Sequence, residues 1–221
     1  MYVKSLQALF SATRLLFTNR RALVLIVCIY AGLLTALYLF VSTREATIFQ
    51  LLVTFLSIAV APALFFLLQS ISVTYVSGSL RKVAIVSLKL FIVSLPVIAL
   101  TAFAAYSVNI TTLRYLLLAV VAPLFAIQLW IVTSNSGLRS LVKRLGHVLS
   151  KTFAPGSVVV YACGFLIFAV APYLLLRKSI STERAWLEIS LLTVRLAASA
   201  TLMLVGWVTT VGAISILSRD D

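Results

Sequence analysis

The apolar positions between residues 138 and 153 recur at the spacing of one helix face. All other positions in the segment except Thr152 are polar, charged or glycine. Ser134-Asn135-Ser136-Gly137 offers capping side chains before the segment, and Ala154-Pro155-Gly156 follows it as a stop. The pattern predicts an amphipathic helix over 138–153, with an apolar face of Leu138, Leu141, Val142, Leu145, Val148, Leu149 and Phe153.

We interpret this segment as a helix that lies flat on the cytoplasmic surface of a membrane. Its apolar face would enter the acyl boundary, while its cations would face anionic headgroups. The alternative is a solvated helix packed against the protein's own loops. In both cases the candidate lipid or partner surface consists of Arg139, Lys143, Arg144, His147 and Lys151.

The first 19 residues predict a second amphipathic helix, with a less regular pattern. Its large apolar side chains share one side, and its polar side chains share the other. We expect it on the same membrane surface. The apolar side carries Val3, Leu6, Phe10 and Phe17, and the polar side carries Lys4, Ser11 and Arg14.

Long apolar runs make up most of the remaining chain. At 1.5 Å per residue, such runs are long enough to cross roughly 30 Å of hydrocarbon. The uncharged stretch from 46 to 80 is too long for one crossing and too short for two. Its polar residues, which begin at Gln69, end the span near 68, and the helix should continue to Gly78. The predicted spans are about 22–41, 46–68, 90–108, 115–132, 157–176 and 196–217.

The composition agrees with this interpretation, because 62% of the 221 residues are hydrophobic and only 10% are charged. A soluble domain could not keep so much apolar surface out of water. We therefore predict an all-α fold, a single integral-membrane domain over 1–221. It would be a polytopic bundle of six transmembrane helices plus two amphipathic interfacial helices.

The net charge of +13 indicates a membrane surface as partner, and not nucleic acid, because the cations flank the spans. Alternate loops differ strongly in their number of cations, which predicts a multi-pass protein of the cytoplasmic (inner) membrane with both termini on the cytoplasmic side. Arg195 remains unassigned. The predicted cytoplasmic side has twelve cations (Lys4, Arg14, Arg20, Arg21, Arg81, Lys82, Lys89, Arg139, Lys143, Arg144, Lys151, Arg219) and the outer side five (Arg44, Arg114, Arg177, Lys178, Arg184).

Glu188 and Arg195 are seven residues apart and share one face of the last helix. Inside a membrane, such a pair would suggest a functional site. However, residues 196–217 suffice to span the membrane alone, which places Arg195 at the outer interface. We therefore predict a helical extension outside the membrane, where Glu188 and Arg195 could form an outer ion pair.

Four prolines lie within the predicted spans and predict helix kinks. Val-Ala-Pro occurs three times, ending at Pro62, Pro123 and Pro172, and the third span contains Pro96. A proline frees a backbone carbonyl, and transporters often place substrate sites at such breaks. Because Val and Ala are abundant here, the three copies do not establish a repeat. A binding cavity at Pro62 and Pro123 is a hypothesis.

Residues that carry enzyme chemistry are sparse. No acid occurs between Glu45 and Glu183, so the spans in between have no paired carboxylates for hydrolysis or proton relay. His147 is the single histidine, and Cys28 and Cys163 lie in apolar runs. We therefore expect no enzyme, no metal site and no evident cofactor. The sequence leaves open a lipid, quinone or pigment between the helices.

Three segments together resemble a known group of proteins. They are Asn19-Arg20-Arg21 at the first span, the polar stretch 70–82 after the second, and the amphipathic segment between spans four and five. The chain resembles bacterial six-span proteins of unknown function that are grouped with the membrane domain of glycerophosphodiester phosphodiesterases. The resemblance implies fold and location only. The catalytic domain of that family has no counterpart here, so its activity is not carried over.

These observations favour a non-catalytic integral-membrane subunit or scaffold that associates with other membrane proteins and with anionic lipids of the cytoplasmic leaflet. The alternative is the membrane (permease) subunit of an ABC-type transporter. An amphipathic first helix, six spans and cytoplasmic helices for an ATPase to hold are all predicted.

The charge asymmetry predicts which loops are accessible from outside the cell. A cysteine introduced at position 181 should react with an impermeant thiol reagent in intact cells, whereas cysteines at 146 or 219 should not. Permeabilised cells provide the control, in which all three positions should react. Labelling of all three in intact cells would contradict the predicted threading.

Overall fold

The computed structural model describes residues 2–44, 47–77, 83–136, 144–177 and 184–220. Every regular element in these ranges is helical, which confirms the all-α class. Six segments are long and apolar enough to cross a membrane, so the chain has the features of a multi-pass membrane protein. Their bounds are Arg20–Ser42, Ile48–Thr74, Val83–Ser107, Thr111–Asn135, Pro155–Arg177 and Trp186–Arg219.

The candidate spans form three helical hairpins. The first pairs α2 (Arg20–Ser42) with α3 (Ile48–Thr74). The second pairs α4 (Val83–Ser107) with the run α5 (Thr111–Leu116), η3 (Leu117–Val121) and α6 (Ala122–Ser136). The third pairs the run α9 (Pro155–Phe165), η5 (Leu166–Val170) and α10 (Ala171–Arg177) with α11 (Ala185–Asp220).

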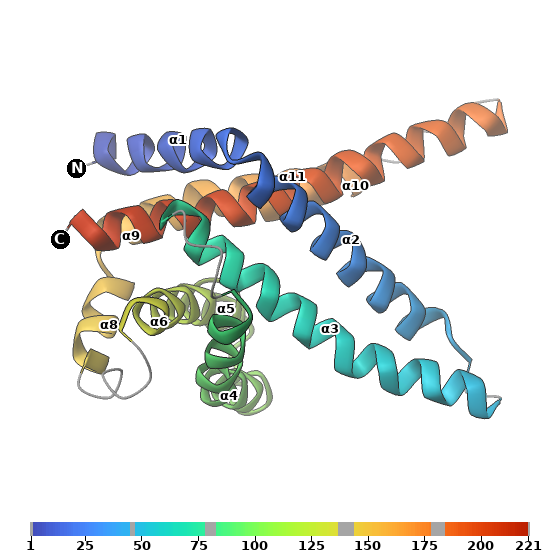
Figure 1. Cartoon of the computed structure of the whole chain (residues 1–221), viewed down its shortest axis with the longest axis horizontal. Coiled ribbons are helices and arrows are strands. Elements are labelled where there is room, and N and C mark those ends of the chain that lie inside the picture. Colours follow the sequence, from blue (N-terminus) through green and yellow to red (C-terminus); the bar gives the residue numbers. More distant parts are fainter. Residues whose placement is uncertain (1, 45–46, 78–82, 137–143, 178–183, 221) are drawn as a thin grey trace.

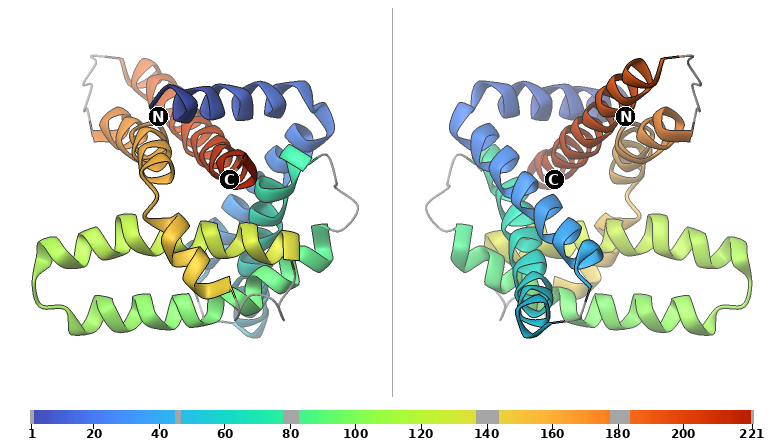
Figure 2. Two further views of the ribbon diagram at one scale, coloured as in Figure 1. Left: turned by 90° about the vertical axis from the view of Figure 1, so that its left-hand side faces the viewer. Right: turned by 90° about the vertical axis from the view of Figure 1, so that its right-hand side faces the viewer.

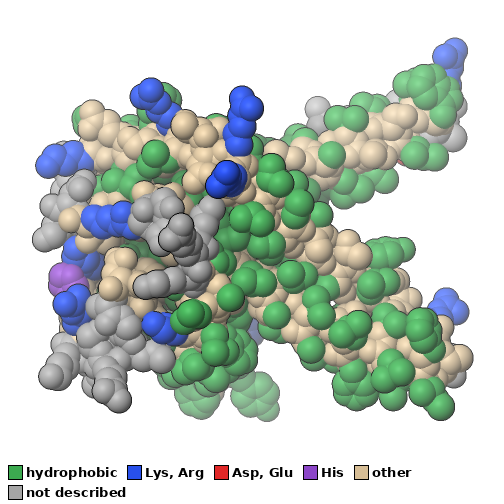
Figure 3. All heavy atoms as spheres, in the orientation of Figure 1, with side chains coloured by type: hydrophobic (Ala, Val, Ile, Leu, Met, Phe, Trp, Pro, Cys, Tyr) green, Lys and Arg blue, Asp and Glu red, His purple; other side chains and the backbone are tan. Residues whose placement is uncertain are grey.

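The three hairpins meet at one end of the molecule and diverge toward the other. Both chain termini lie at the end where the hairpins meet (Figure 1). The second hairpin is seen end-on in Figure 1 and at full length in Figure 2, so it points away from the other two. Lys and Arg side chains gather at the end that carries the termini (Figure 3).

Helix α11 is the central element of the convergence. In the span Trp186–Arg219, 56% of the most apolar window is buried, against 17–39% in the other five spans. Val208, Val211 and Ile214 are fully buried and pack against residues of the other hairpins. The C-terminal half of α11 therefore supplies the surface that the other helices share.

Glycines allow α11 to approach its neighbour closely. A Cβ on Gly206 would lie 2.9 Å from Ile167 Cγ2 and 3.0 Å from the Phe168 backbone nitrogen, both in η5. A Cβ on Gly164 of α9 would overlap the side chain of Thr210 on α11. Each helix thus presents a glycine to the other, as small residues do where membrane helices cross closely.

Helix α1 (Tyr2–Thr18) packs along α11 through small residues, and not through the large apolar face that the sequence suggested. Ser5, Ala8, Ala12 and Leu16 are buried. The predicted apolar residues Val3, Leu6, Phe10 and Phe17 are 56–73% exposed. The helix therefore has two distinct apolar faces, and the one with the larger side chains is exposed.

A tyrosine joins α1 to the end of α3. Tyr75, in the short helix η1 (Tyr75–Ser77), is buried and donates a hydrogen bond of 3.2 Å to the carbonyl oxygen of Ala12. Burial raises the pKa of this phenol above its ordinary value, so the hydroxyl remains a donor. The predicted continuation of the second span beyond residue 68 is confirmed, since α3 reaches Thr74.

Helix bounds differ from the predicted ones at two places. Helix α6 continues beyond residue 132 to Ser136, and Ser134 Oγ donates to the Ile131 carbonyl at 2.9 Å. The predicted helix start at residue 138 lies outside the described residues. The third span starts earlier than residue 90, so Lys89 lies within α4. Helix α11 begins at Ala185, which confirms that a helical extension precedes residue 196.

The glycine crossing predicts a difference between two alanine substitutions. Gly206→Ala should lower the free energy of unfolding by about 1–3 kcal/mol, because its methyl group meets backbone that cannot rotate away. Gly146→Ala, where a Cβ meets nothing within 4 Å, should cause no loss because alanine favours the helix. Unfolding of the detergent-solubilised protein measures both. Equal effects would contradict the close crossing.

Candidate functional site

The amphipathic segment that the sequence singled out is described only in its second half. Helix α8 (Leu145–Thr152) begins after Arg144, and Arg139 and Lys143 lie outside the described residues. Arg144 and His147 are exposed. The predicted stop is confirmed, since α8 ends at Thr152 and Pro155 begins α9.

Helix α8 packs against the protein with only part of its predicted apolar face. Val148 and Thr152 are fully buried, and Val148 packs against Leu129 of α6 and two valines of α4. Leu145, Leu149 and Phe153 remain 38–60% exposed. The helix therefore docks on the bundle by one edge and leaves the other edge exposed.

Lys151 and Arg195 bind backbone carbonyls of other helices. Lys151 Nζ donates to the carbonyl oxygen of Ser218 at 3.1 Å, at the end of α11. Arg195 Nε donates to the carbonyl oxygen of Leu175 in α10 at 2.7 Å, and a second guanidinium nitrogen binds the same oxygen. Arg195 thus bridges the third hairpin, while Glu188 is exposed on the predicted outer extension of α11.

The four prolines have two different structural outcomes. Helices α3 and α4 continue through Pro62 and Pro96. By contrast, π-helical turns stand directly before the Ala-Pro steps at Pro123 and Pro172, and in each turn the backbone N–H of the alanine bonds five residues back. A proline lacks the N–H that an α-helix needs, and a π turn shifts the hydrogen bonding around it.

A carbonyl freed by one of these prolines has found a partner in another hairpin. Pro123 cannot donate to the carbonyl oxygen of Ala119, four residues earlier. Tyr161 of α9 donates its hydroxyl to that oxygen at 2.6 Å. The third hairpin therefore supplies the hydrogen bond that the break in the second hairpin lacks. A backbone group freed inside a membrane needs such a partner.

Beside this break is a cavity of about 500 Å³ where the three hairpins meet, which we name the junction cavity. Pro123 lines it, as the proline hypothesis suggested, whereas Pro62 lies elsewhere on α3. All six candidate spans contribute side chains. Those used below are Tyr30, Phe65, Gln69, Ile98, Trp130, Phe168, Met203 and Trp207.

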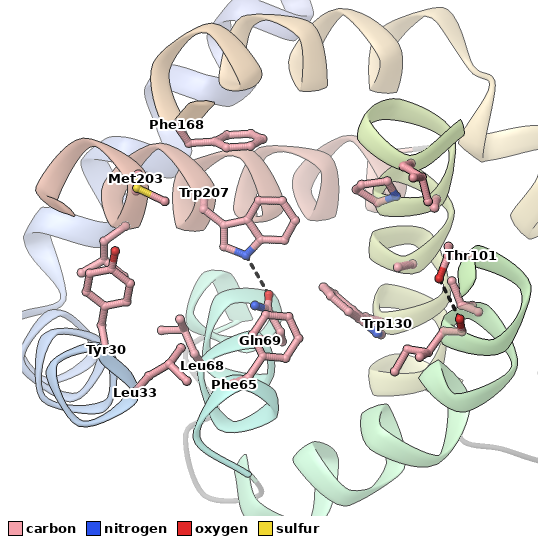
Figure 4. A pocket seen from close by; sticks show the side chains of 17 residues that line it. Tyr30, Leu33, Phe65, Leu68, Gln69, Thr101, Trp130, Phe168, Met203 and Trp207 are labelled. Atoms are coloured by element: carbon pink, nitrogen blue, oxygen red, sulfur yellow. Dashed lines mark hydrogen bonds between the residues drawn. The ribbon is translucent and has the colours of Figure 1, made fainter. Parts of the chain in front are cut away.

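Five of the seventeen residues that line the junction cavity are aromatic, and two of these are tryptophans whose indoles are hydrogen-bonded. Figure 4 shows the bond between Trp207 and Gln69. Trp207 Nε1 donates to Gln69 Oε1 at 2.8 Å, and Trp130 Nε1 donates to Ser94 Oγ at 2.7 Å. Phe168 stands edge-on to Trp207, with ring centroids 5.2 Å apart. The polar atoms of the indoles are thus occupied, and the rings offer apolar surface.

Sequence reasoning missed Gln69 and Trp207 as partners. Gln69 served only to mark the end of a span, although it is 99% buried (1% exposed). The two residues are 138 positions apart, so no local spacing connects them. A polar amide inside a long apolar helix was the available signal, because such a group needs a buried partner.

Comparison with known proteins adds no family: no family model, curated protein or solved structure matches the chain. The resemblance to the phosphodiesterase membrane domain is therefore supported only at the level of six candidate spans. Within the described residues, no group of three or more His, Cys, Asp or Glu is placed to hold a metal ion.

The bond between Gln69 and Trp207 predicts a non-additive mutant cycle. Gln69→Leu or Trp207→Phe alone should destabilise the protein by about 1–3 kcal/mol, because each leaves a polar partner unsatisfied in an apolar cavity. The double variant should be more stable than the sum of the two losses predicts. Thermal unfolding in detergent gives the values, and Trp186→Phe, an exposed tryptophan, should have little effect. Strict additivity would contradict the coupling.

Proposed function

We propose that the protein is a non-catalytic subunit of a membrane complex, and that its junction cavity receives side chains from a transmembrane helix of a different partner subunit. The observation that carries this proposal is the divergence of three hairpins from one packed end (Figures 1 and 2). Most of the apolar surface of five spans is left without a partner inside the chain.

The lining of the cavity supports a protein occupant. Each hairpin contributes an apolar side chain that both lines the cavity and stays open to the surroundings: Phe65 is 37% exposed, Ile98 51% and Met203 46%. Lipid gives helices no hydrophobic reason to associate, so partner helices are held by close packing. Fixed aromatic rings around a cavity supply such packing, and large aromatics dominate protein interfaces.

The proposed location is the cytoplasmic membrane, with the converging end and both termini on the cytoplasmic side. The described cations Lys4, Arg14, Arg144, Lys151 and Arg219 lie on the parts of the chain that form this end. Anionic lipids of that leaflet would attract them. The subunit would thus contact anionic lipid at its packed end and a partner helix between its hairpins.

The permease alternative remains a second candidate, on the specific observation that α1 packs along α11. A cytoplasmic ATPase that moved this first helix would act directly on the longest span. Copurification of an ATPase in mild detergent would favour this alternative, whereas copurification of integral-membrane proteins without an ATPase favours the subunit.

Site-specific photocrosslinking in intact cells tests the proposal. A benzophenone side chain that replaces Ile98 or Met203 should attach to one membrane protein of defined mass, because both positions border the junction cavity. At Val24, which is 60% exposed on α2 and is not part of the cavity lining, the same probe should give no such adduct. If Ile98 and Met203 yield only lipid adducts, the proposed occupant is wrong.

A further inference from the structure

A second cavity, of about 440 Å³, lies at the converging end between α1, the junction of α8 with α9, and the end of α11. We name it the basic cavity, because Lys4 and Lys151 both line it. None of the described residues that line it is acidic. Its other polar lining residues include Ser5, Gln7, Ser157 and Ser218, while Ala8, Ile216 and Leu217 add apolar surface.

Hydrogen bonds between four elements hold one wall of the basic cavity. Gln128 of α6 donates its amide to Ser157 Oγ at 3.2 Å, and Ser218 Oγ donates to Gln128 Oε1 at 3.3 Å. Lys151 of α8 binds the carbonyl oxygen of Ser218. This network places one lysine and two serines around the cavity and fixes their positions, because Gln128 and Ser157 are 1% and 5% exposed.

Unused donors converge on this wall. Helix α9 begins at Pro155 with no side-chain cap, so the helix geometry leaves the N–H groups of Gly156 and Ser157 without intrahelical acceptors. Both residues line the cavity. Ser157 Oγ accepts from Gln128 and keeps its own proton to donate. The positive end of the α9 dipole adds to the two lysine charges.

Ser5 is an independent indication of a ligand. It is 98% buried (2% exposed) and lines the cavity, with its Oγ 3.7 Å from the position that a Cβ on Gly156 would take. No hydrogen bond joins this hydroxyl to another described residue, and its oxygen is not one of the fully enclosed atoms without a partner. Because Ser5 lines the cavity, another molecule there can complete the bonding of this hydroxyl.

We infer that the basic cavity binds the phosphate headgroup of an anionic phospholipid. Two ammonium groups, serine hydroxyls and free backbone N–H groups are the donors that phosphate oxygens require. The cavity lies beside α1, whose exposed Val3, Leu6 and Phe10 suit an acyl boundary, so a lipid can enter with its glycerol toward the apolar lining. This inference extends the proposed contact with anionic lipid from a general surface attraction to a defined site.

Native mass spectrometry of the detergent-solubilised full chain tests the site, with phosphatidylglycerol as the anionic probe and phosphatidylcholine as the neutral one. The Lys4→Gln/Lys151→Gln variant should bind phosphatidylglycerol on the order of tenfold more weakly than the natural chain, with phosphatidylcholine binding unchanged. Lys4→Gln alone keeps the hydrogen bond between Lys151 and Ser218 and should cause part of the loss of phosphatidylglycerol binding. This single variant replaces the double variant if the double variant does not fold.

Arg44→Gln/Arg177→Gln is the control, because it removes two exposed cations, one just after α2 and one at the end of α10, that lie outside the cavity lining and away from the converging end. It should change phosphatidylglycerol binding less than twofold. An equal loss in both double variants, or a loss in neither, overturns the inference.

Competition by soluble phosphate distinguishes a phospholipid headgroup from a free phosphate as the ligand of the basic cavity. Millimolar inorganic phosphate or glycerol phosphate should compete weakly with phosphatidylglycerol, because neither has acyl chains to bury. Displacement of the lipid by equimolar inorganic phosphate overturns the lipid assignment. The crosslinks expected at Ile98 and Met203 should persist in the lysine variants, so failure of this site and failure of the proposed partner subunit can be told apart.

Discussion

The close crossing of α11 with α9 and η5 is the contact on which the rest of the structure depends. Gly206 allows the backbone of η5 to approach, and Gly164 makes room for Thr210. Because α11 also packs against α1, α3 and α6, its position sets the place of the other two hairpins. In lipid, such an approach gains van der Waals contact that larger side chains would prevent.

The same crossing connects the two cavities to one framework. Gly206 meets Ile167 and the backbone of Phe168, and the ring of Phe168 stands against Trp207 in the wall of the junction cavity. Further along α11, Ser218 joins the network that positions Lys151 beside the basic cavity. A single helix therefore lines both an apolar cavity between the hairpins and a polar cavity at the converging end, the two places where we propose that protein and lipid bind.

Three polar side chains within the candidate spans join helices to one another. Gln69, Ser94 and Tyr161 each bond a group from another helix, and none belongs to a cluster of acids or histidines among the described residues. In an apolar surrounding, an unpaired amide or hydroxyl costs far more than a paired one gains. These bonds therefore select one arrangement of hairpins among the many that apolar packing alone would permit.

The sequence by itself determined the all-α class, the six apolar segments, the helix over residues 2–18 and the end of α8 before Pro155, because apolar run length, 3.6-residue periodicity and proline are local signals. It did not determine helix ends such as Ser136, where α6 runs on, nor the start of α4 ahead of Lys89. Only the tertiary structure decided that Ser5 and Ala8, and not Phe10, pack on α11, and that Gln69 meets Trp207. Those contacts join residues far apart in the chain, and close approach in three dimensions, not spacing in the sequence, creates them.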